Sequence, residues 1–273
     1  IAIDAATFEV LNIQSITAAN AIVAGGAGEA GEAGRAGEEG AGTTAGEAGE
    51  AGEAGESGTA ATTTISVNTN ATINVTGDQD LNMGTISGEN ATVNAADFTG
   101  DLTVTGEAGN NTIVGGSGAD TINGGTGADT LTGGAGADDF VFTLATNVTG
   151  GAPDDLVFDE IIDFNVGADE IDFSATELTV EVVTAAATAG TASINSEGVA
   201  SFAEADEDLG QKITAVEAAI DGAGGSANGD FAFFEHSGST YIFVYDDTSG
   251  VDSADALIRL TGVTGLSDST LTD

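Results

Sequence analysis

The sequence lacks several residue types, and each shortage excludes a class of protein. Among 273 residues there is no cysteine or tryptophan, one proline, one histidine, and three basic residues against 45 acidic ones. Without cysteine there is no disulfide bond, so stability must come from a core or from bound metal. With a formal net charge of -42, the chain has no basic surface with which to bind nucleic acid or anionic lipid directly.

Long apolar runs are also missing. No segment approaches the roughly 18 apolar residues that a membrane-spanning helix needs. The chain begins at Ile1, without methionine and without the basic and apolar regions of a secretory signal peptide. We expect a fragment, a processed form, or a protein whose export signal is not N-terminal.

Recognisable catalytic motifs are absent as well. The single histidine, His236, lies at an expected hairpin turn, and the sequence contains no HExxH, G-x-S-x-G or P-loop motif. Carboxylates are so frequent that no acid/base pair stands out. We therefore expect no enzymatic activity in this chain. If it belongs to a secreted enzyme, the catalytic part lies upstream of Ile1.

The acidic excess has a consequence for folding. A compact state with this charge repels itself unless counterions relieve it, and divalent cations do so most effectively. Adaptation to a saline habitat is a compatible explanation. Bound divalent ions would also allow contact between this acidic chain and an anionic cell-surface polysaccharide.

A nine-residue repeat, G-G-x-G-x-D-x-U-x with U apolar, runs from Gly106 to Phe142. Its copies begin at Gly106, Gly115, Gly124 and Gly133, and the register does not slip. The sixth positions are Asn111, Asp120, Asp129 and Asp138, and the eighth positions are Ile113, Ile122, Leu131 and Phe140.

Each position of the repeat has a physical role. Glycines let the backbone turn its carbonyls toward one point, and the residue at position six adds a carboxylate. Calcium takes six to eight oxygen ligands, so one such turn supplies about half a shell. The candidate glycines at positions one and four are Gly115, Gly118, Gly124, Gly127, Gly133 and Gly136.

Two consecutive repeats are expected to form one flattened coil of 18 residues, each repeat supplying a turn and a short strand. Stacking of such coils would let Asp120 share an ion with Asp138 on one edge, and Asn111 share one with Asp129 on the other. We expect the second site to be weaker, because Asn111 is neutral and Glu107 replaces the second glycine of its repeat.

This stretch resembles the repeats-in-toxin (RTX) β-roll of proteins exported by Gram-negative type I secretion. The resemblance implies bound Ca²⁺ and a secreted, extracellular or cell-surface location. The following segment, residues 159–174, resembles the part that closes such rolls. Its acids either complete further calcium sites or form the solvated face of two strands that pack Ile161, Phe164, Ile171 and Phe173 inside; these acids are Asp159, Asp163, Asp169 and Asp172.

We expect an all-β protein: a parallel β-solenoid or β-roll, followed by a β-rich C-terminal region with one helix. The chain divides into strands at 1–24, a Gly-Glu-Ala tract at 25–58, irregular solenoid rungs at 59–105, the roll at 106–142, and a closing and secretion or assembly region at 143–273. In that last region we expect a helix at 202–221, a hairpin that turns at Ser237 to Ser239, and a third strand in ALIRLTGV.

Two segments also resemble bacterial surface-layer (S-layer) proteins. One runs from Thr72 into the repeats, and the other is the tail that contains Asp246, Asp247, Asp252 and Asp255 followed by LIRLTGVTGLS. The last three of these acids either hold an ion or form an acidic β-turn. The resemblance implies self-assembly of identical chains into a lattice or filament. The alternative is a calcium-dependent export and folding module of a secreted RTX enzyme or adhesin.

The tract from Gly25 to Gly58 has glycine at every third residue except at Thr43. A collagen triple helix is not expected, because the only proline is Pro153. A polyproline-II-like bundle of two arms that reverse at Thr43 and Thr44, with glutamate rows bridged by calcium or Arg35, is one interpretation. A loop held by contacts with neighbours is the other.

Overall fold

The computed structural model describes most of the chain outside the Gly-Glu-Ala tract. The described residues are 10–15, 20–21, 64–143, 157–173, 178, 180, 182–223, 229–246, 255–266 and 271–272. The expected arms at 25–58, with Thr43, Thr44 and Arg35, lie outside them, as do Asp247 and Asp252.

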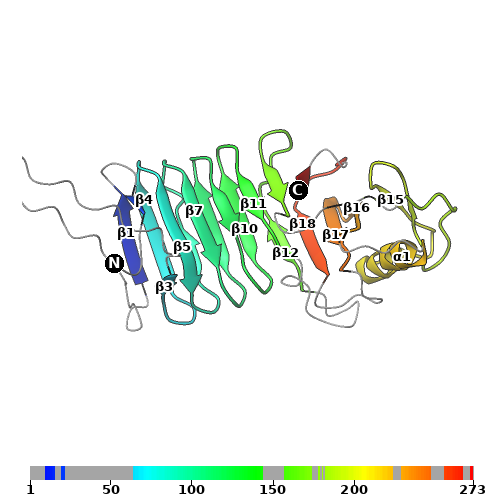
Figure 1. Ribbon diagram of the computed structural model, residues 1–273, viewed down its shortest axis with the longest axis horizontal. Coiled ribbons are helices and arrows are strands. Elements are labelled where there is room, and N and C mark those ends of the chain that lie inside the picture. The colour runs from blue at the N-terminus through cyan, green and yellow to red at the C-terminus, as the bar shows by residue number, and fades with distance from the viewer. Residues whose placement is uncertain are drawn as a thin grey trace, which may run out of the picture.

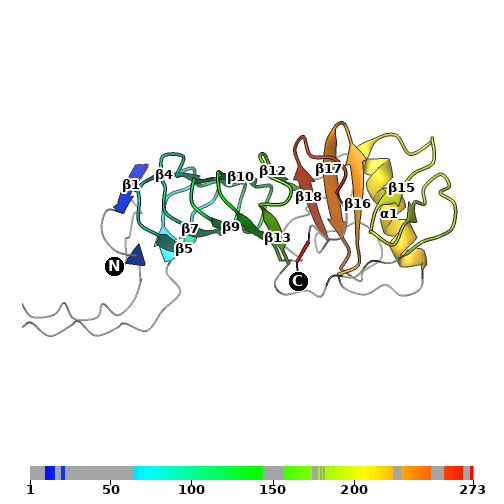
Figure 2. The ribbon, with the colours of Figure 1, turned by 90° about the horizontal axis from the view of Figure 1, so that it is seen from above.

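The larger part of the described chain forms an elongated solenoid of two parallel sheets (Figures 1 and 2). In spatial order, one sheet contains β1 (Val10–Ser15), β4 (Thr72–Gly77), β6 (Thr92–Asn94), β8 (Thr112–Gly116), β10 (Thr130–Gly134) and β12 (Asp159–Ile161). The other contains β2 (Asn20–Ala21) and β3 (Thr64–Ser66), then β5 (Leu81–Ser87), β7 (Leu102–Gly106), β9 (Thr121–Asn123), β11 (Asp139–Val141), β13 (Glu170–Asp172) and β19 (Leu271–Thr272). The predicted solenoid is confirmed.

Strand register places one apolar side chain of each repeat in a continuous core. Leu131 pairs with Ile113 across β10 and β8, and Phe140 pairs with Ile122 across β11 and β9. All four of these side chains are buried, because alternate residues of a strand point to opposite faces. The core of the solenoid is thus a stack of the eighth positions of the repeats, as the period predicts.

The closing segment continues the same two sheets. β12 pairs with β10 and β13 pairs with β11, both in parallel. The apolar residues expected to pack inside are all buried: Ile161, Phe164, Ile171 and Phe173.

The C-terminal lobe caps this end of the solenoid (Figure 1). β18 (Ala256–Leu260) pairs in parallel with β12, and β17 (Ser239–Val244) and β16 (Phe231–His236) extend the sheet in antiparallel order. Ser237 and Gly238 form the hairpin turn, both with positive φ, and a second hairpin joins β14 (Ser193–Ile194) to β15 (Ala200–Ser201). The expected hairpin and third strand are confirmed.

The single helix of the described residues is α1 (Leu209–Gly222), which is shorter than the expected 202–221. Its start is set by Asp208, whose carboxylate accepts a hydrogen bond from the Gln211 N–H at 2.7 Å in a capping box. Phe202 therefore lies outside the helix, where its ring meets Phe234 edge-on. No helix in the described part of the chain is long and apolar enough to cross a membrane.

The first coil of the solenoid is split. Asn20 and Ala21 of β2 pair with Leu81 and Asn82 of β5, whereas β3 pairs with the same strand from Thr85 onward. On β5, the positions that pair with β2 and with β3 are separated only by Met83 and Gly84, although 42 residues, 22–63, separate β2 from β3 in the sequence.

Candidate calcium site

The first candidate site is a column of residues at one edge of the solenoid, which we call the Asp120 column. Oδ1 of Asp120 accepts a hydrogen bond from the Leu102 N–H at 2.8 Å, and Oδ1 of Asp138 accepts one from the Asp120 N–H at 2.9 Å. Oδ1 of Asp169 continues the series by accepting from the Asp138 N–H at 3.1 Å. The predicted stacking of Asp120 on Asp138 at a spacing of 18 residues is confirmed.

The opposite edge carries an equivalent series, which we call the Asp129 column. Oδ1 of Asn111 accepts from the Ala91 N–H at 2.8 Å, and Oδ1 of Asp129 accepts from the Asn111 N–H at 2.7 Å. Oδ1 of Asp159 accepts from the Asp129 N–H at 2.7 Å. Asn111 and Asp129 therefore stack as expected, and Asp159 follows them although it lies outside the regular repeats.

Four aspartates of these columns use one carboxyl oxygen to accept a backbone hydrogen bond, whereas the other oxygen has no hydrogen-bond partner. The buried Oδ2 atoms that lack a hydrogen-bond partner include those of Asp120, Asp129, Asp138 and Asp159. A buried carboxylate oxygen without a donor is costly unless a cation or a proton meets it. The columns thus hold four buried carboxyl oxygens, each of which needs a cation or a proton.

Without a metal, the buried aspartates of the columns have raised pKa values, because burial disfavours their charged form. Burial raises the pKa of Asp120 to about 7, with further increases from Asp138 and Asp101, against the hydrogen bond from Leu102 that lowers it. Burial likewise raises the pKa of Asp129 to about 7. For Asp159, burial and then the charge of Asp129 raise the pKa well above its usual range.

The glycines of the repeats keep space for these oxygens and for the neighbouring coil. A Cβ atom at Gly115 would collide with Oδ2 of Asp120 and approach the Gly133 carbonyl oxygen to 2.7 Å. Positions one of the next repeats, Gly124 and Gly133, face the carboxylates of Asp129 and Asp138 in the same way. Positions four, which are Gly118, Gly127 and Gly136, lie against carbonyl oxygens of the preceding coil. Each turn therefore brings a carboxylate and backbone carbonyls together.

The remaining acids of the closing segment have other surroundings. Both oxygens of Asp163 accept backbone hydrogen bonds, from Gly133 at 3.0 Å and Gly134 at 2.9 Å. The second oxygen of Asp169 accepts from the Asn165 N–H at 2.7 Å. Asp172 lies away from the turns, on β13, where burial and then Glu170 raise its pKa. Asp159 and Asp172 are thus the acids of this segment with a buried oxygen that lacks a hydrogen-bond partner, and of these two Asp159 continues the Asp129 column.

No group of three or more His, Cys, Asp or Glu side chains placed to hold a metal occurs among the described residues. A cation in either column would therefore need backbone carbonyls among its ligands. In the acidic tail, Oδ1 of buried Asp255 accepts from the Asp246 N–H at 3.1 Å. The residues between these two, which include Asp247 and Asp252, lie outside the described part of the chain.

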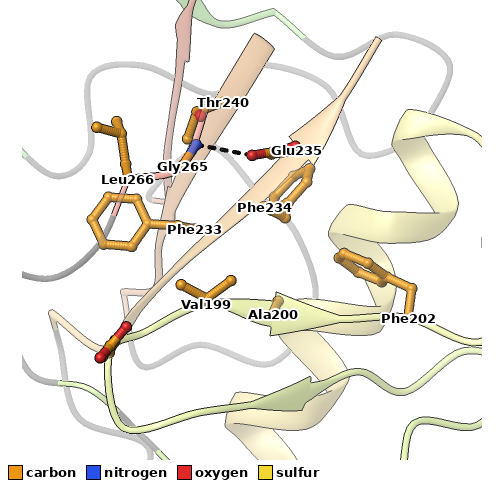
Figure 3. Close-up of a pocket in the computed structure, with 10 residues that line it drawn as sticks. Val199, Ala200, Phe202, Phe233, Phe234, Glu235, Thr240, Gly265 and Leu266 are labelled. Atoms are coloured by element: carbon orange, nitrogen blue, oxygen red, sulfur yellow. Dashed lines mark hydrogen bonds between the residues drawn. The ribbon is translucent and has the colours of Figure 1, made fainter. Parts of the chain in front are cut away.

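A second candidate is an open pocket of about 440 Å³ in the C-terminal lobe (Figure 3). Phe233 and Phe234 form part of its wall, and Glu235 accepts a hydrogen bond from the Gly265 N–H at 2.9 Å. Thr240 is the only lining residue with a hydroxyl or thiol, and this hydroxyl donates to the Val263 carbonyl at 2.9 Å. The charged residues of the lining are Glu197 and Glu235.

Comparison with known proteins agrees with the geometry of the columns. A family model for the RTX calcium-binding nonapeptide repeat, in 4 copies, matches residues 105–140. No curated protein matches the chain. The matched repeats are calcium-binding repeats, so Ca²⁺ is the ion that fits the unpartnered carboxylates and the converging carbonyls.

Proposed function

We propose that the chain is a structural, calcium-binding protein of a Gram-negative cell surface, which assembles with copies of itself into an S-layer-like lattice or an extracellular filament. Calcium binding is supported by the two columns, whose aspartates have buried carboxylate oxygens without hydrogen-bond partners. Most of these aspartates lie within the matched RTX repeats. Bound Ca²⁺ supplies the positive charge that these oxygens and the net charge of -42 require.

The same requirement suggests a route of secretion. Extracellular calcium modules bind at roughly 0.1 to 1 mM, which is far above cytosolic calcium. The columns would then be unsatisfied in the cytosol, where the chain would stay unfolded for type I export, and they would fill outside the cell. RTX repeats are typical of secreted bacterial proteins, which agrees with this sequence of events.

Self-assembly is supported by the edges of the solenoid. In the described residues, β1 is the outer strand of one sheet, and β2 and β3 lie outermost in the other. Such strands present backbone groups that can pair with another chain. The acidic surface also allows calcium-bridged contact with an anionic polysaccharide. The proposal includes no enzymatic activity.

The calcium part is tested by circular dichroism of the purified protein with and without excess EGTA. We expect the β signal to be lost on chelation and regained on adding millimolar calcium. An unchanged spectrum would refute calcium-dependent folding.

Assembly is tested by electron microscopy in millimolar calcium. Lattices or filaments are expected. A calcium-folded chain that stays monomeric at high concentration would favour the alternative function, an export and folding module of a secreted RTX enzyme or adhesin.

A further inference from the structure

The side chain of Asn111 makes hydrogen bonds that the aspartates of the two columns do not make. Its Oδ1 accepts from the Ala91 N–H, so Nδ2 points in the other direction. There Nδ2 donates to two carbonyl oxygens, those of Gly109 and Gly124, each at 3.1 Å. The amide thus satisfies both of its polar ends within the protein.

These two carbonyls belong to turns of consecutive coils, which is where the oxygens of a shared ion would converge. The two N–H bonds of the Asn111 amide thus meet these carbonyl oxygens where a shared cation would otherwise meet them. Asn111 is also neutral and only 2% exposed, so it adds no charge to attract an ion. Its amide therefore takes the place of an ion between the turns of Asn111 and Asp129.

The next two residues of the Asp129 column, Asp129 and Asp159, differ from Asn111 because their side chains are not fully hydrogen-bonded. Asp129 and Asp159 are each 1% exposed, and the Oδ2 atoms of both lack a partner. The nearby cation Arg259 pairs with Glu160, the residue after Asp159. Two buried, adjacent carboxylates with free oxygens remain, and the hydrogen bond from Asp129 to Oδ1 of Asp159 holds them in register.

We propose that the Asp129 column binds its calcium ion between Asp129 and Asp159, and that the side chain of Asn111 replaces the ion in the turn before. This inference rests on the proposed calcium function. It places a metal site across the boundary of the matched repeats, which end at residue 140. Because β12 begins at Asp159 and pairs with β18, the ion would couple the roll to the C-terminal lobe.

The experiment counts bound calcium in the whole chain by equilibrium dialysis and atomic emission. Asp159→Asn should bind one ion fewer than the parent, and it should still fold, because an asparagine can repeat the arrangement seen at Asn111. Asn111→Asp should bind one ion more. The double variant Asn111→Asp with Asp159→Asn should return to the parent number.

A matched control is Glu89→Gln, which removes one charge at an exposed position of the solenoid and should leave the number unchanged. An unaltered number in Asp159→Asn, or no gain in Asn111→Asp, would overturn the inference while the parent's calcium-dependent folding still stood. A parent chain that binds no calcium would instead refute the proposed function itself. Asn111→Asp gives an independent result if Asp159→Asn fails to fold.

Discussion

The backbone N–H of Asp120 donates a hydrogen bond to Oδ1 of Asp138, 2.9 Å away and 18 residues along the chain. This one contact links the two coils and leaves Oδ2 of each residue buried without a partner. The charge of Asp138 also contributes to the raised pKa of Asp120. The two carboxylates therefore behave as one unit that a single ion can neutralise.

Asp120→Ala and Asp138→Ala should consequently have the same effect. Each removes one charged ligand of the same ion, so each should raise the calcium concentration at the folding midpoint by about tenfold or more, since ligand charge sets affinity. Asp129→Ala should act on the other column and give a separate change. Calcium titrations of the three variants provide the measurement. If Asp120→Ala matched Asp129→Ala and differed from Asp138→Ala, the shared ion would be refuted.

The calcium-free chain should lose stability as pH rises from about 4 to about 7. Burial raises the pKa values of Asp120 and Asp129 to about 7, whereas the ordinary value is 3.8. Between these values the folded state binds more protons than the unfolded state, so its stability falls with increasing pH. With calcium present the trend should reverse, because metal binding displaces those protons.

Circular dichroism in EGTA at pH 4.5 and pH 7.5 measures this dependence: because the calcium-free chain is expected to be unfolded near neutral pH, the β signal should be larger at pH 4.5. General charge repulsion changes in the same direction, so the control is Asp120→Asn with Asp129→Asn, which should flatten part of the slope. A metal-free parent that is less stable at pH 4.5 than at pH 7.5 would contradict the prediction.

Alanine substitutions at two glycines should distinguish the cost of backbone strain from the cost of a steric clash between coils. Gly134 has φ +105° and a Cβ there would collide with the Gly116 carbonyl oxygen, whereas Gly167 has φ +92° and open space around it. Gly167→Ala should cost roughly 1–2 kcal/mol from strain alone. Gly134→Ala should cost about 2–5 kcal/mol, because a steric term is added. Urea unfolding in saturating calcium compares the two, and equal losses would argue against close contact between the coils.

The regular part of the fold could be predicted because each repeat position has a local physical requirement. Ile122 and Phe140 are buried, and Asp120 and Asp138 are stacked, where the period of nine places them. Glycine, carboxylate and apolar residue must recur together for a coil to form. The nine-residue period therefore also predicts the register of the strands in the two sheets.

Asp159 is a candidate calcium ligand in the sequence, but its position in the Asp129 column could not be predicted from the repeat. Its place in the column depends on the pairing of Glu160 and Ile161 with Thr130 and Leu131, which no local period indicates, because the repeat is interrupted after Phe142. The predicted start of the helix at residue 202 is wrong for a related reason: the apolar spacing includes Phe202, but the capping box of Asp208 sets the start at Leu209. In both cases a tertiary contact or a cap outweighed the apolar pattern.

Deleting Gly25 to Gly58 should leave the calcium-dependent fold intact but weaken assembly. The described strands on either side of this tract, β2 and β3, pair with the same neighbour β5, so the rung does not need the tract in order to form. Its composition gives it few apolar side chains for the core, whereas its glycines permit close backbone approach by another chain.

The deletion variant should therefore show the parent's circular dichroism transition with calcium. In electron microscopy at millimolar calcium it should form fewer or shorter lattices or filaments. Arg35→Gln, which keeps the tract and removes its only basic residue, is the matched control and isolates ion pairing from backbone contact. Assemblies of the deletion variant that are indistinguishable from the parent's would show that the tract is a passive insertion in the first coil.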